Sequence, residues 1–418
     1  RDIRALPAGH AMIASAKGIR VTRWWDLPIE EPLHLRDPRE YVDGFREVLE
    51  RAVADRVTSD RIAISMSGGL DSSSIAALAA PKAHVTAFTN VFEPLVPDDE
   101  RRFALSTASH LGIDIQIIEA ANVRLFEKWD RPEYQKEEPC NDPLSSITTD
   151  AFRRASQLAP VMLSGQGGDA VLYASHSYFF NLLRGGRFLR FASEVAGHLA
   201  TKHRLPPLCL RSSFRRALGR RAPRPDYPNW IAPDLEKKLD LRARWDAYWD
   251  DEPEIHPTRP QAFNLLRGIG WQRLHEYVDA EAMGAPIEYR NPLLDVRVVR
   301  YLLRVPPMPW FAEKEILRAA MKGMLPEDVR LRRKKAIPID PSHLWLDRQA
   351  DALCRAIAAM DDLDAWVQRD RVIAAIRNPA RSNYDSFLLV LPLSLGLWIA
   401  AKVQQTAVSS IICKELSV

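Results

Sequence analysis

The segment SGGLDSS at residues 67–73 constrains this chain more than any other feature, because it joins a short apolar run to a run of small residues. Arg61–Met66 is predicted to be a buried strand and Ser72–Ala80 a helix. Adjacent glycines allow positive φ and a close approach of the backbone to a ligand. Serine hydroxyls and the first helical amides place donors there, and the helix dipole adds partial positive charge. The segment therefore predicts a phosphate-binding turn between a strand and a helix.

The alternative is an ordinary strand-to-helix turn in which Asp71 or Ser72 caps the helix. The whole heptapeptide favours nucleotide binding, although no GKS or GKT follows and the third glycine of a dinucleotide fingerprint is missing. Asp71 suits such a turn if it holds magnesium, which bridges phosphate oxygens. We therefore expect a nucleotide and Mg²⁺ as cofactors. The predicted nucleotide-binding residues of this segment are Ser67, Gly68, Gly69, Leu70, Asp71, Ser72 and Ser73.

Strand and helix patterns alternate after this segment. The predicted strands are Val85–Val91, Ile113–Ile118 and Val161–Ser164, and the predicted helices are Asp98–Leu111 and Ser146–Gln157. Such alternation predicts an α/β fold with a parallel sheet flanked by helices. Ligands of such sheets bind at the carboxyl ends of the strands.

The second half of the chain is predicted to be mostly helical. Helices are expected at Pro38–Val57 before the sheet, and at Arg259–Met283, Asp295–Leu303 and Glu313–Gly323 after it. Arginine and lysine cluster at residues 184–221 and 330–335, where a solvated face and binding of an acidic partner or phosphate are both open interpretations. The first of these clusters, at residues 184–221, falls in a predicted insert at residues 175–258.

Composition indicates a protein of the cytoplasm. The four cysteines are far apart and suit a reduced compartment. No stretch of about 18 uncharged apolar residues occurs, and Phe387–Val403 carries Lys402, so we expect a buried helix there and no membrane span. The chain begins at Arg1 without a leader, which we interpret as a start inside a longer protein.

Three further motifs resemble those of one family. LSGQGGD at residues 163–169 resembles LSGEGSDE, and IEYRNPLLD at 287–295 resembles EARVPFLD. Lys314–Arg318, the pair at 325–326 and the run at 332–335 resemble a K-x-x-LR…LP…RxK tail. With the pyrophosphate loop at 67–73, they follow the order found in the asparagine synthetase-like superfamily of ATP pyrophosphatases. That group includes asparagine synthetase B, β-lactam synthetase and the lasso peptide cyclases.

The resemblance implies an adenine nucleotide α-hydrolase-like synthetase domain at residues 36–405, a remnant of a glutaminase-like domain at 1–35 and a tail at 406–418. The resemblance to ATP pyrophosphatases also implies that the nucleotide is ATP, and that Asp71 and Asp169 hold magnesium. Glu288 would lie near the reacting amine and accept its proton, and Lys334 would stabilise the charged intermediate. The strand at 87–91 would lie against the nucleotide. The second loop would add the nucleotide-binding residues Gly165, Gln166 and Gly167.

Each of these assignments has an ordinary structural alternative. Asp169 follows two glycines and could be a turn acid. Glu288 stands near Arg290 and could form a surface ion pair. Lys334 belongs to a basic run in which Lys335 is a close competitor. The joint order of the motifs favours the functional interpretation.

Three departures from the family pattern indicate which member of the superfamily the chain most resembles. No cysteine precedes residue 140, so no glutaminase activity is assigned. Gln166 stands where β-lactam synthetase has a tyrosine, and Ala170 replaces an acidic residue of asparagine synthetases. The pattern looks most like a lasso peptide cyclase, which adenylates an Asp or Glu side chain of a precursor peptide and closes a macrolactam with the N-terminal amine.

The rival interpretation is an asparagine synthetase-like amidotransferase. A homologue that binds a nucleotide or a partner without catalysis is a weaker alternative, because the predicted site residues are intact. An RNA-directed member of the ATP pyrophosphatases is also weaker, because no zinc ligands or RNA module are recognisable. The expected partners are the precursor peptide, a leader peptidase and a leader-recognition protein of the same pathway, with no nucleic acid and no membrane.

Overall fold

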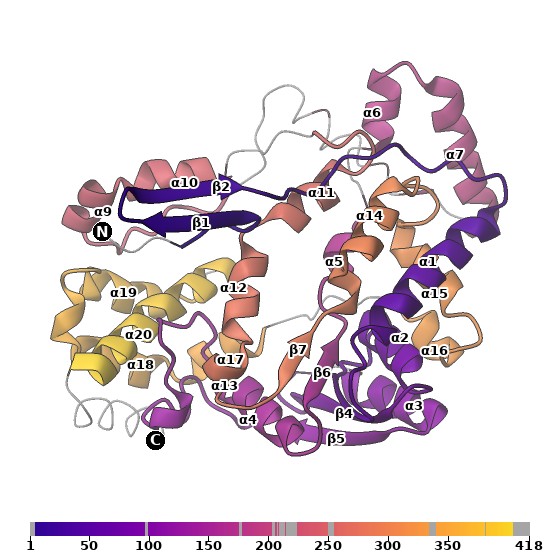
Figure 1. The fold of residues 1–418 in the computed structure, drawn as a ribbon. Coiled ribbons are helices and arrows are strands. Elements are labelled where there is room, and N and C mark those ends of the chain that lie inside the picture. Colours follow the sequence, from indigo (N-terminus) through magenta and orange to yellow (C-terminus); the bar gives the residue numbers. More distant parts are fainter. Residues whose placement is uncertain are drawn as a thin grey trace.

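A computed structural model describes residues 5–96, 99–174, 178–202, 205, 206, 208, 214, 224–249, 255–333, 340–380 and 382–403. Its centre is one parallel sheet with helices on both faces, drawn at the lower right of Figure 1. A mostly helical C-terminal part lies beside it. This arrangement confirms the predicted fold class.

The central sheet has five parallel strands in the order β5-β4-β3-β6-β7. Their bounds are β3 Arg61–Ser65, β4 His84–Val91, β5 Asp114–Glu119, β6 Val161–Ser164 and β7 Glu288–Arg290. From β3 the chain winds outward through β4 and β5, then returns to place β6 on the other side of β3. The strand order therefore reverses between β3 and β6, and the carboxyl ends of these two strands form the usual ligand position of such a sheet.

The sheet is buried on both faces, as parallel sheets require. Ile62 and Ile64 of β3 belong to a core with the helices on one face, whereas Ala63 belongs to a second core with α4 on the other. The helices that contribute to these cores or pack beside them are α1 Pro38–Ala54, α2 Leu70–Ala79, α3 Glu100–Leu111, α4 Ser145–Ser156, α14 Val296–Arg304, α15 Glu315–Ala320 and α16 Glu327–Arg330.

The remaining described elements surround this centre. They are the strands β1 His10–Ser15 and β2 Gly18–Arg23, the helices α5 Gly168–Val171, α6 Tyr178–Arg184, α7 Phe188–Lys202, α9 Pro233–Leu239, α10 Leu241–Trp249, α11 Pro260–Arg267, α12 Gly270–Tyr277, α13 Ala280–Met283, α17 Pro341–Arg348, α18 Ala350–Ala358, α19 Arg369–Ile376 and α20 Asn383–Val403, and the 3₁₀ turns Pro132–Tyr134, Pro292–Leu294, Ala312–Lys314 and Asp361–Leu363. β1 and β2 form an antiparallel hairpin separate from the central sheet. Its origin as a remnant of a glutaminase-like domain stays a prediction.

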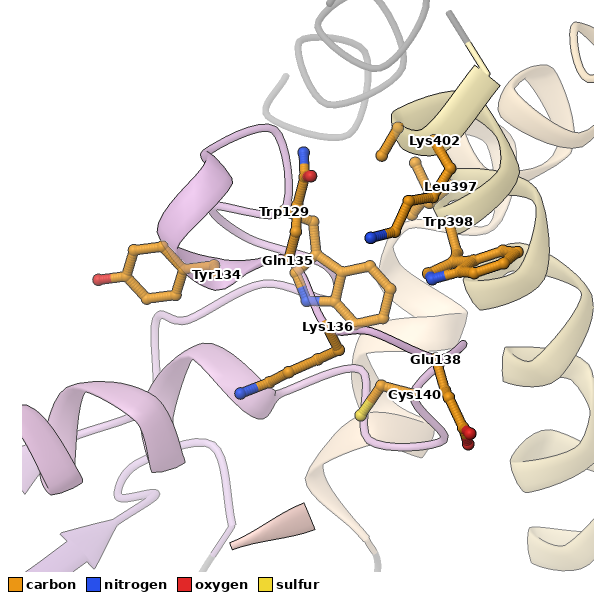
Figure 2. Close-up of a pocket in the computed structure, with 10 residues that line it drawn as sticks. Trp129, Tyr134, Gln135, Lys136, Glu138, Cys140, Leu397, Trp398 and Lys402 are labelled. Atoms are coloured by element: carbon orange, nitrogen blue, oxygen red, sulfur yellow. The ribbon is translucent and has the colours of Figure 1, made fainter. Parts of the chain in front are cut away.

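α20 is the main element of the C-terminal core. Leu389, Leu393 and Leu397 are buried there among residues of α18 and α19. Figure 2 shows Leu397 and Trp398 facing the loop that carries Trp129, and Trp398 Nε1 donates a hydrogen bond to the carbonyl of Glu137 at 3.0 Å. The predicted buried helix is thus confirmed.

By length and composition alone, α20 could also cross a membrane. Its most apolar window has a mean hydropathy of 1.6, and 56% of that window is buried inside the protein. Within the part of the chain that the structure describes, no second helix passes the same test. A largely buried helix of this kind is common in the core of a globular protein.

Two predicted helices are interrupted, and the strand β7 of the central sheet was not predicted. Arg259–Met283 forms three short helices, which Gly268 and Asp279 separate. The helix predicted from Glu313 begins only at Glu315, because Glu313 and Lys314 have φ of 54° and 60°. β7 has only three residues and too little pattern to be recognised from sequence.

The buried carboxylate of Asp295 ties α14 to the end of α1. Its side chain caps α14 by accepting from the Arg297 amide at 2.8 Å, and it pairs with Arg56 at 2.6 Å. Burial opposes the charge, but hydrogen bonds from Arg297 and Arg56 outweigh burial and hold the pKa of Asp295 well below its usual range. A lowered pKa gives stability that is present above the unfolded-state pKa of about 4 and is lost as the pH falls below it.

We therefore predict that Asp295→Asn lowers the free energy of unfolding by about 1–3 kcal/mol at pH 7. The difference from wild type should shrink as urea titrations are repeated from pH 5 towards pH 3. Asp55→Asn is the matched control, because Asp55 pairs with the same Arg297 at 2.6 Å but is half exposed. Its effect should stay below about 1 kcal/mol. If the difference in the free energy of unfolding between Asp295→Asn and wild type did not change with pH, the charge of Asp295 would not be its cause.

Candidate active site

A cleft of about 650 Å³ opens at the carboxyl ends of β3 and β6. That volume is within the range of small-molecule sites. The described residues that line it are Ser65, Ser67, Gly69, Leu70, Asp71, Ser72, Glu100, Ser164, Gly165, Gln166, Gly167, Gly168, Asp169, Ala170, Tyr173, Leu265, Trp271, Tyr289, Lys314, Arg318 and Arg332. Most residues predicted to bind nucleotide are therefore brought together here.

The first wall is the turn between β3 and α2. Ser67 is exposed to the cleft, and its amide donates to Ser72 Oγ at 3.2 Å. Ser72 Oγ in turn donates to the carbonyl of Gly69 at 3.3 Å. Gly69 has no side chain and opens α2 as its N-cap residue. These contacts shape a small turn at a helix N-terminus, which is suited to bind an anion.

Two residues of the predicted loop do not face the cleft. The hydroxyl of Ser73 is fully buried and lies 3.2 Å from Thr107 Oγ1 of α3, and its amide donates within the helix to Gly69. Gly68 has a φ of +63°, and a Cβ there would lie 2.6 Å from the Ala104 amide nitrogen. The prediction that the Ser73 side chain contacts phosphate is therefore wrong. Gly68 has the positive φ that the turn needs, and it allows the turn to pack on α3.

The second wall is the loop after β6, which packs directly on the first. A Cβ on Gly165 would lie 2.5 Å from the Ser72 amide nitrogen, and a Cβ on Gly168 would lie 2.3 Å from Asp71 Oδ2. Gly167 has a φ of +94° and faces Leu294. Only glycine permits this approach of two backbones. The loop therefore needs glycine at these positions in order to bring Asp169 towards Asp71.

Gly165→Ala is expected to separate the two loops. The added methyl group has no room beside a helix backbone, so the free energy of unfolding should fall by about 1–3 kcal/mol and ATP should bind at least about tenfold more weakly. Calorimetric titration with Mg–ATP and urea unfolding measure both effects. Gly270→Ala is the matched control, because nothing lies within 4 Å of a Cβ there. Equal ATP affinity in both variants would contradict the close packing.

Asp71 and Asp169 meet at one lysine. Lys314 Nζ forms an ion pair with Asp71 and lies 2.8 Å from Asp169 Oδ1. The carboxylates thus converge from two different loops on one point of the cleft. Two carboxylates together with phosphate oxygens and water form the hard oxygen set that Mg²⁺ prefers, so the donors present fit this metal. Among the described residues no set of three or more His, Cys, Asp and Glu side chains forms a metal site.

Lys314 is a functional residue that the sequence interpretation did not assign. Its left-handed backbone, with φ of 60°, ends the turn before α15 and directs the side chain at the two aspartates. The motif that contains it was recognised, but its pairing with residues 71 and 169 is a long-range contact. An ammonium in this position, beside two carboxylates, can also bind a phosphate oxygen.

Arginines complete a cationic side of the cleft. Arg332 donates to the Gly68 carbonyl at 3.1 Å and lies over the Phe103 ring. Arg318 is buried, and it donates to the carbonyls of Arg330 and Arg332, the latter at 2.8 Å. Arg318 therefore fixes the chain that leads into the basic run. Lys334, the predicted catalytic lysine, lies outside the described residues.

Glu288 does not reach this cleft. β7 runs parallel to β6, and Glu288 is paired with Val161 at the first residue of both strands, the edge opposite the ligand side. Its carboxylate is mostly exposed and pairs with Arg290 at 2.6 Å, which lowers its pKa. The prediction that Glu288 accepts the proton of the amine is therefore wrong. Glu288 forms the surface ion pair that was its alternative interpretation.

The carboxyl end of β7 supplies other groups. Tyr289 lines the cleft, and burial raises its pKa so that the phenol stays protonated. Ser164 Oγ donates to Asn291 Oδ1 at 2.7 Å and accepts from the Gln166 amide at 3.1 Å. Asn291 Nδ2 lies 3.2 Å from His275 Nε2. This chain of hydrogen bonds, which is buried at Ser164 and Asn291, holds the start of the second loop in place.

Together, the parallel sheet, the glycine-lined turn at a helix N-terminus and the two converging aspartates form a cleft suited to bind a nucleoside triphosphate with its metal. Residues 44–400 match the model of the asparagine synthase family. The chain belongs to that family.

Curated relatives are distant and longer than this chain. An asparagine synthetase (glutamine-hydrolyzing) 3 of Bacillus subtilis is 24% identical, covering 81% of this chain and 54% of its own length. An amidase, chyE, of Penicillium rubens is 26% identical, covering 82% and 59%. The chain therefore spans a little over half the length of these relatives. The solved NH₃-dependent NAD synthetase of Campylobacter jejuni matches 53% of this chain and 99% of its own, with a TM-score of 0.23 and 17% identity.

Proposed function

We propose that this protein adenylates an Asp or Glu side chain of a precursor peptide with ATP and lets the N-terminal amine of the peptide displace AMP. The product is a macrolactam, as in lasso peptide cyclases. The observation that carries the proposal is the convergence of Asp71 and Asp169 on Lys314 beside the phosphate turn. That arrangement suits a triphosphate with its metal and leaves the cleft open beside it.

The residues of the cleft have separate tasks in this reaction. The turn at 67–72 would bind the pyrophosphate part of ATP through backbone and serine donors. Lys314 and Arg332 would offset the charge that develops on the departing pyrophosphate. Asp71 and Asp169 would hold magnesium, which when bound neutralises and orients phosphate oxygens. The tight glycine packing would keep these groups fixed relative to the carboxylate.

The amine must lose a proton before or during its attack. Because Glu288 lies at the other edge of the sheet, the acceptor has to be another group. Besides Asp71, the carboxylates among the described lining residues are Glu100 and Asp169. We assign proton acceptance to Glu100 and leave magnesium binding to Asp71 and Asp169.

A peptide substrate is favoured over free aspartate by the second loop. Ala170 is buried where asparagine synthetases have an acidic residue, so this position offers no carboxylate to an α-ammonium group. The names of two relatives support the alternative, an amidotransferase that gives aspartate an amide nitrogen.

Mass spectrometry tests the proposal. A precursor peptide from the same genome neighbourhood, incubated with the protein, ATP and Mg²⁺, should lose one water while AMP and pyrophosphate form in equal amounts. Release of AMP with aspartate and ammonia alone, without peptide, would favour the amidotransferase. Formation of ADP with any substrate would rule out adenylation.

A further inference from the structure

The cleft has an aromatic wall in addition to its cationic side. Three of its lining residues, Leu265, Trp271 and Tyr289, form this wall. Tyr289 belongs to β7, whereas Leu265 and Trp271 belong to α11 and α12. His275 of α12 contacts Asn291, which directly follows β7, so α12 packs at the carboxyl end of that strand. The wall therefore lies on the β7 side of the phosphate turn.

The cationic side and the expected place of the nucleotide lie towards β4, and β4 and β7 are on opposite sides of β3. Arg332 reaches the ring of Phe103 in α3, a helix that packs on β4 and β5. Glu100, which lines the cleft, also lines a space of about 440 Å³ at the end of β4. ATP that extends from the phosphate turn in this direction leaves the aromatic wall open to the second substrate.

The side chains of the wall are held in fixed positions. Trp271 Nε1 donates to the Leu265 carbonyl at 2.8 Å, and the Trp271 carbonyl lies 2.8 Å from His275 Nδ1. The ring of Tyr289 packs on that of Phe152, with 5.3 Å between the ring centres. Aromatic rings that are already ordered bind an apolar group with little further loss of side-chain freedom.

The wall continues onto the surface beside the cleft. Leu265 is 47% exposed, and Ile269, the N-cap residue of α12, is 63% exposed. Apolar side chains that stay exposed next to a cleft favour the packing of an apolar group from a bound molecule. The cleft thus offers cations and metal ligands for a triphosphate on one side and an apolar surface on the other.

We infer that the aromatic wall binds an apolar or aromatic side chain next to the reacting carboxylate, so that the acyl substrate is a peptide segment with such a residue beside its Asp or Glu. The inference rests on the proposed function and names the substrate class of the same site. Free aspartate has no group that could cover the wall. An apolar neighbour would cover it and hold the carboxylate towards the phosphate turn.

The probes are two blocked peptides that differ only in the residues beside the carboxylate, acetyl-leucyl-glutamyl-leucinamide and acetyl-seryl-glutamyl-serinamide, together with free aspartate. Their binding is measured by calorimetry and saturation-transfer NMR, and the two peptides are repeated with aspartyl in place of glutamyl. We expect the leucyl peptide to bind at least about tenfold more tightly than the seryl peptide and aspartate. Equal binding of the two peptides, or tighter binding of aspartate, would overturn the inference.

Variants of the wall locate the preference. Trp271→Ala and Leu265→Ser should each bring the leucyl peptide to within about threefold of the seryl peptide, whereas Trp271→Phe should keep most of the preference. Trp366→Ala is the matched control, because Trp366 is a 41% exposed tryptophan of the C-terminal part that does not line the cleft. Mg–ATP affinity should stay within about twofold in all four variants, which also shows that they are folded. If Trp271→Ala weakens Mg–ATP and keeps the peptide preference, the wall serves the nucleotide and the inference fails.

Trapping with hydroxylamine separates this inference from the proposed function. The glutamyl carboxylate attacks ATP to give an acyl-adenylate and pyrophosphate, and hydroxylamine then displaces AMP to give the hydroxamate. We expect hydroxamate from the leucyl peptide at a kcat/KM at least about tenfold above that of the seryl peptide. Equal kcat/KM for the two peptides would sink the inference and leave adenylation in place. Selective binding without hydroxamate from any probe would instead sink the proposed function.

Discussion

Replacing Asp71 by asparagine is expected to reduce AMP formation by about a hundred- to a thousandfold. The change keeps the volume beside Gly168 but removes one of two carboxylates that converge on Lys314. The metal then loses an oxygen ligand of full charge, and the ammonium of Lys314 keeps only one of its two carboxylate partners, Asp169. Turnover measured as AMP release, together with titration of Mg–ATP, separates a binding defect from a defect in the chemical step.

The control for Asp71 is Asp114→Asn. Asp114 is an exposed aspartate at the amino edge of the same sheet, where β5 begins. Its replacement should leave AMP formation within about twofold of wild type, since exposed surface substitutions have small effects. Asp169→Asn should follow Asp71→Asn, and the double variant should lose little more than either single one, because both act on one bound group. If Asp71→Asn kept more than half of the wild-type activity, the site would be assigned wrongly.

Arg259→Met is expected to lower the free energy of unfolding by about 2–4 kcal/mol. Arg259 is fully buried, and its guanidinium donates to the carbonyls of Leu302 and Val171 at 2.8 Å each and of Tyr173 at 3.0 Å. It also lies 3.4 Å above the centre of the Phe311 ring. Burial lowers its pKa, so the charge is tolerated only because these groups surround it. Methionine fills the space but removes the guanidinium donor from all three carbonyls, of which Leu302 keeps the Val305 amide at 3.3 Å.

Urea unfolding of two further variants identifies the cause of this loss. Arg259→Lys should not restore stability, because one ammonium cannot reproduce the planar fork that reaches three carbonyls. Arg267→Met changes a partly exposed arginine at the end of the same helix, one that pairs with Asp26 at 3.1 Å. It should cost less than about 1 kcal/mol. Full rescue by lysine would mean that charge alone, and not the carbonyl contacts, stabilises this position.

The centre of the fold could be predicted because the strands β3 to β6 and the helices α2, α3 and α4 are each marked by a local sequence pattern. The apolar run at 61–66 and the small residues of α2 define their own structures, and the alternation that follows leads to a parallel sheet. β7 was not predicted because its three residues are too few to show the alternating pattern of a strand. The break at Glu313 and Lys314 was missed because positive φ at such residues depends on packing and not on local preference.

The site was predicted as far as its loops, and less well for single side chains. Asp71 and Asp169 are placed by motifs that the sequence displays, and they do converge. The hydroxyl of Ser73 faces Thr107 because α3 packs against α2 at this point. A packing contact of this kind cannot be predicted from a local sequence pattern. Glu288 falls at the wrong edge because its place depends on the register of β7 against β6. The pairing of Lys314 is likewise a tertiary contact between distant segments.

The most direct measurement follows oxygen atoms through the reaction. A substrate whose reacting carboxylate is labelled with ¹⁸O is turned over with ATP and Mg²⁺, and the nucleotide products are examined by ³¹P NMR. Formation of an acyl-adenylate in the cleft between residues 67–73 and 164–169 transfers one labelled oxygen to AMP, and the Asp71→Asn variant should lose this transfer. Label in inorganic phosphate, with ADP as the nucleotide product, would contradict the account.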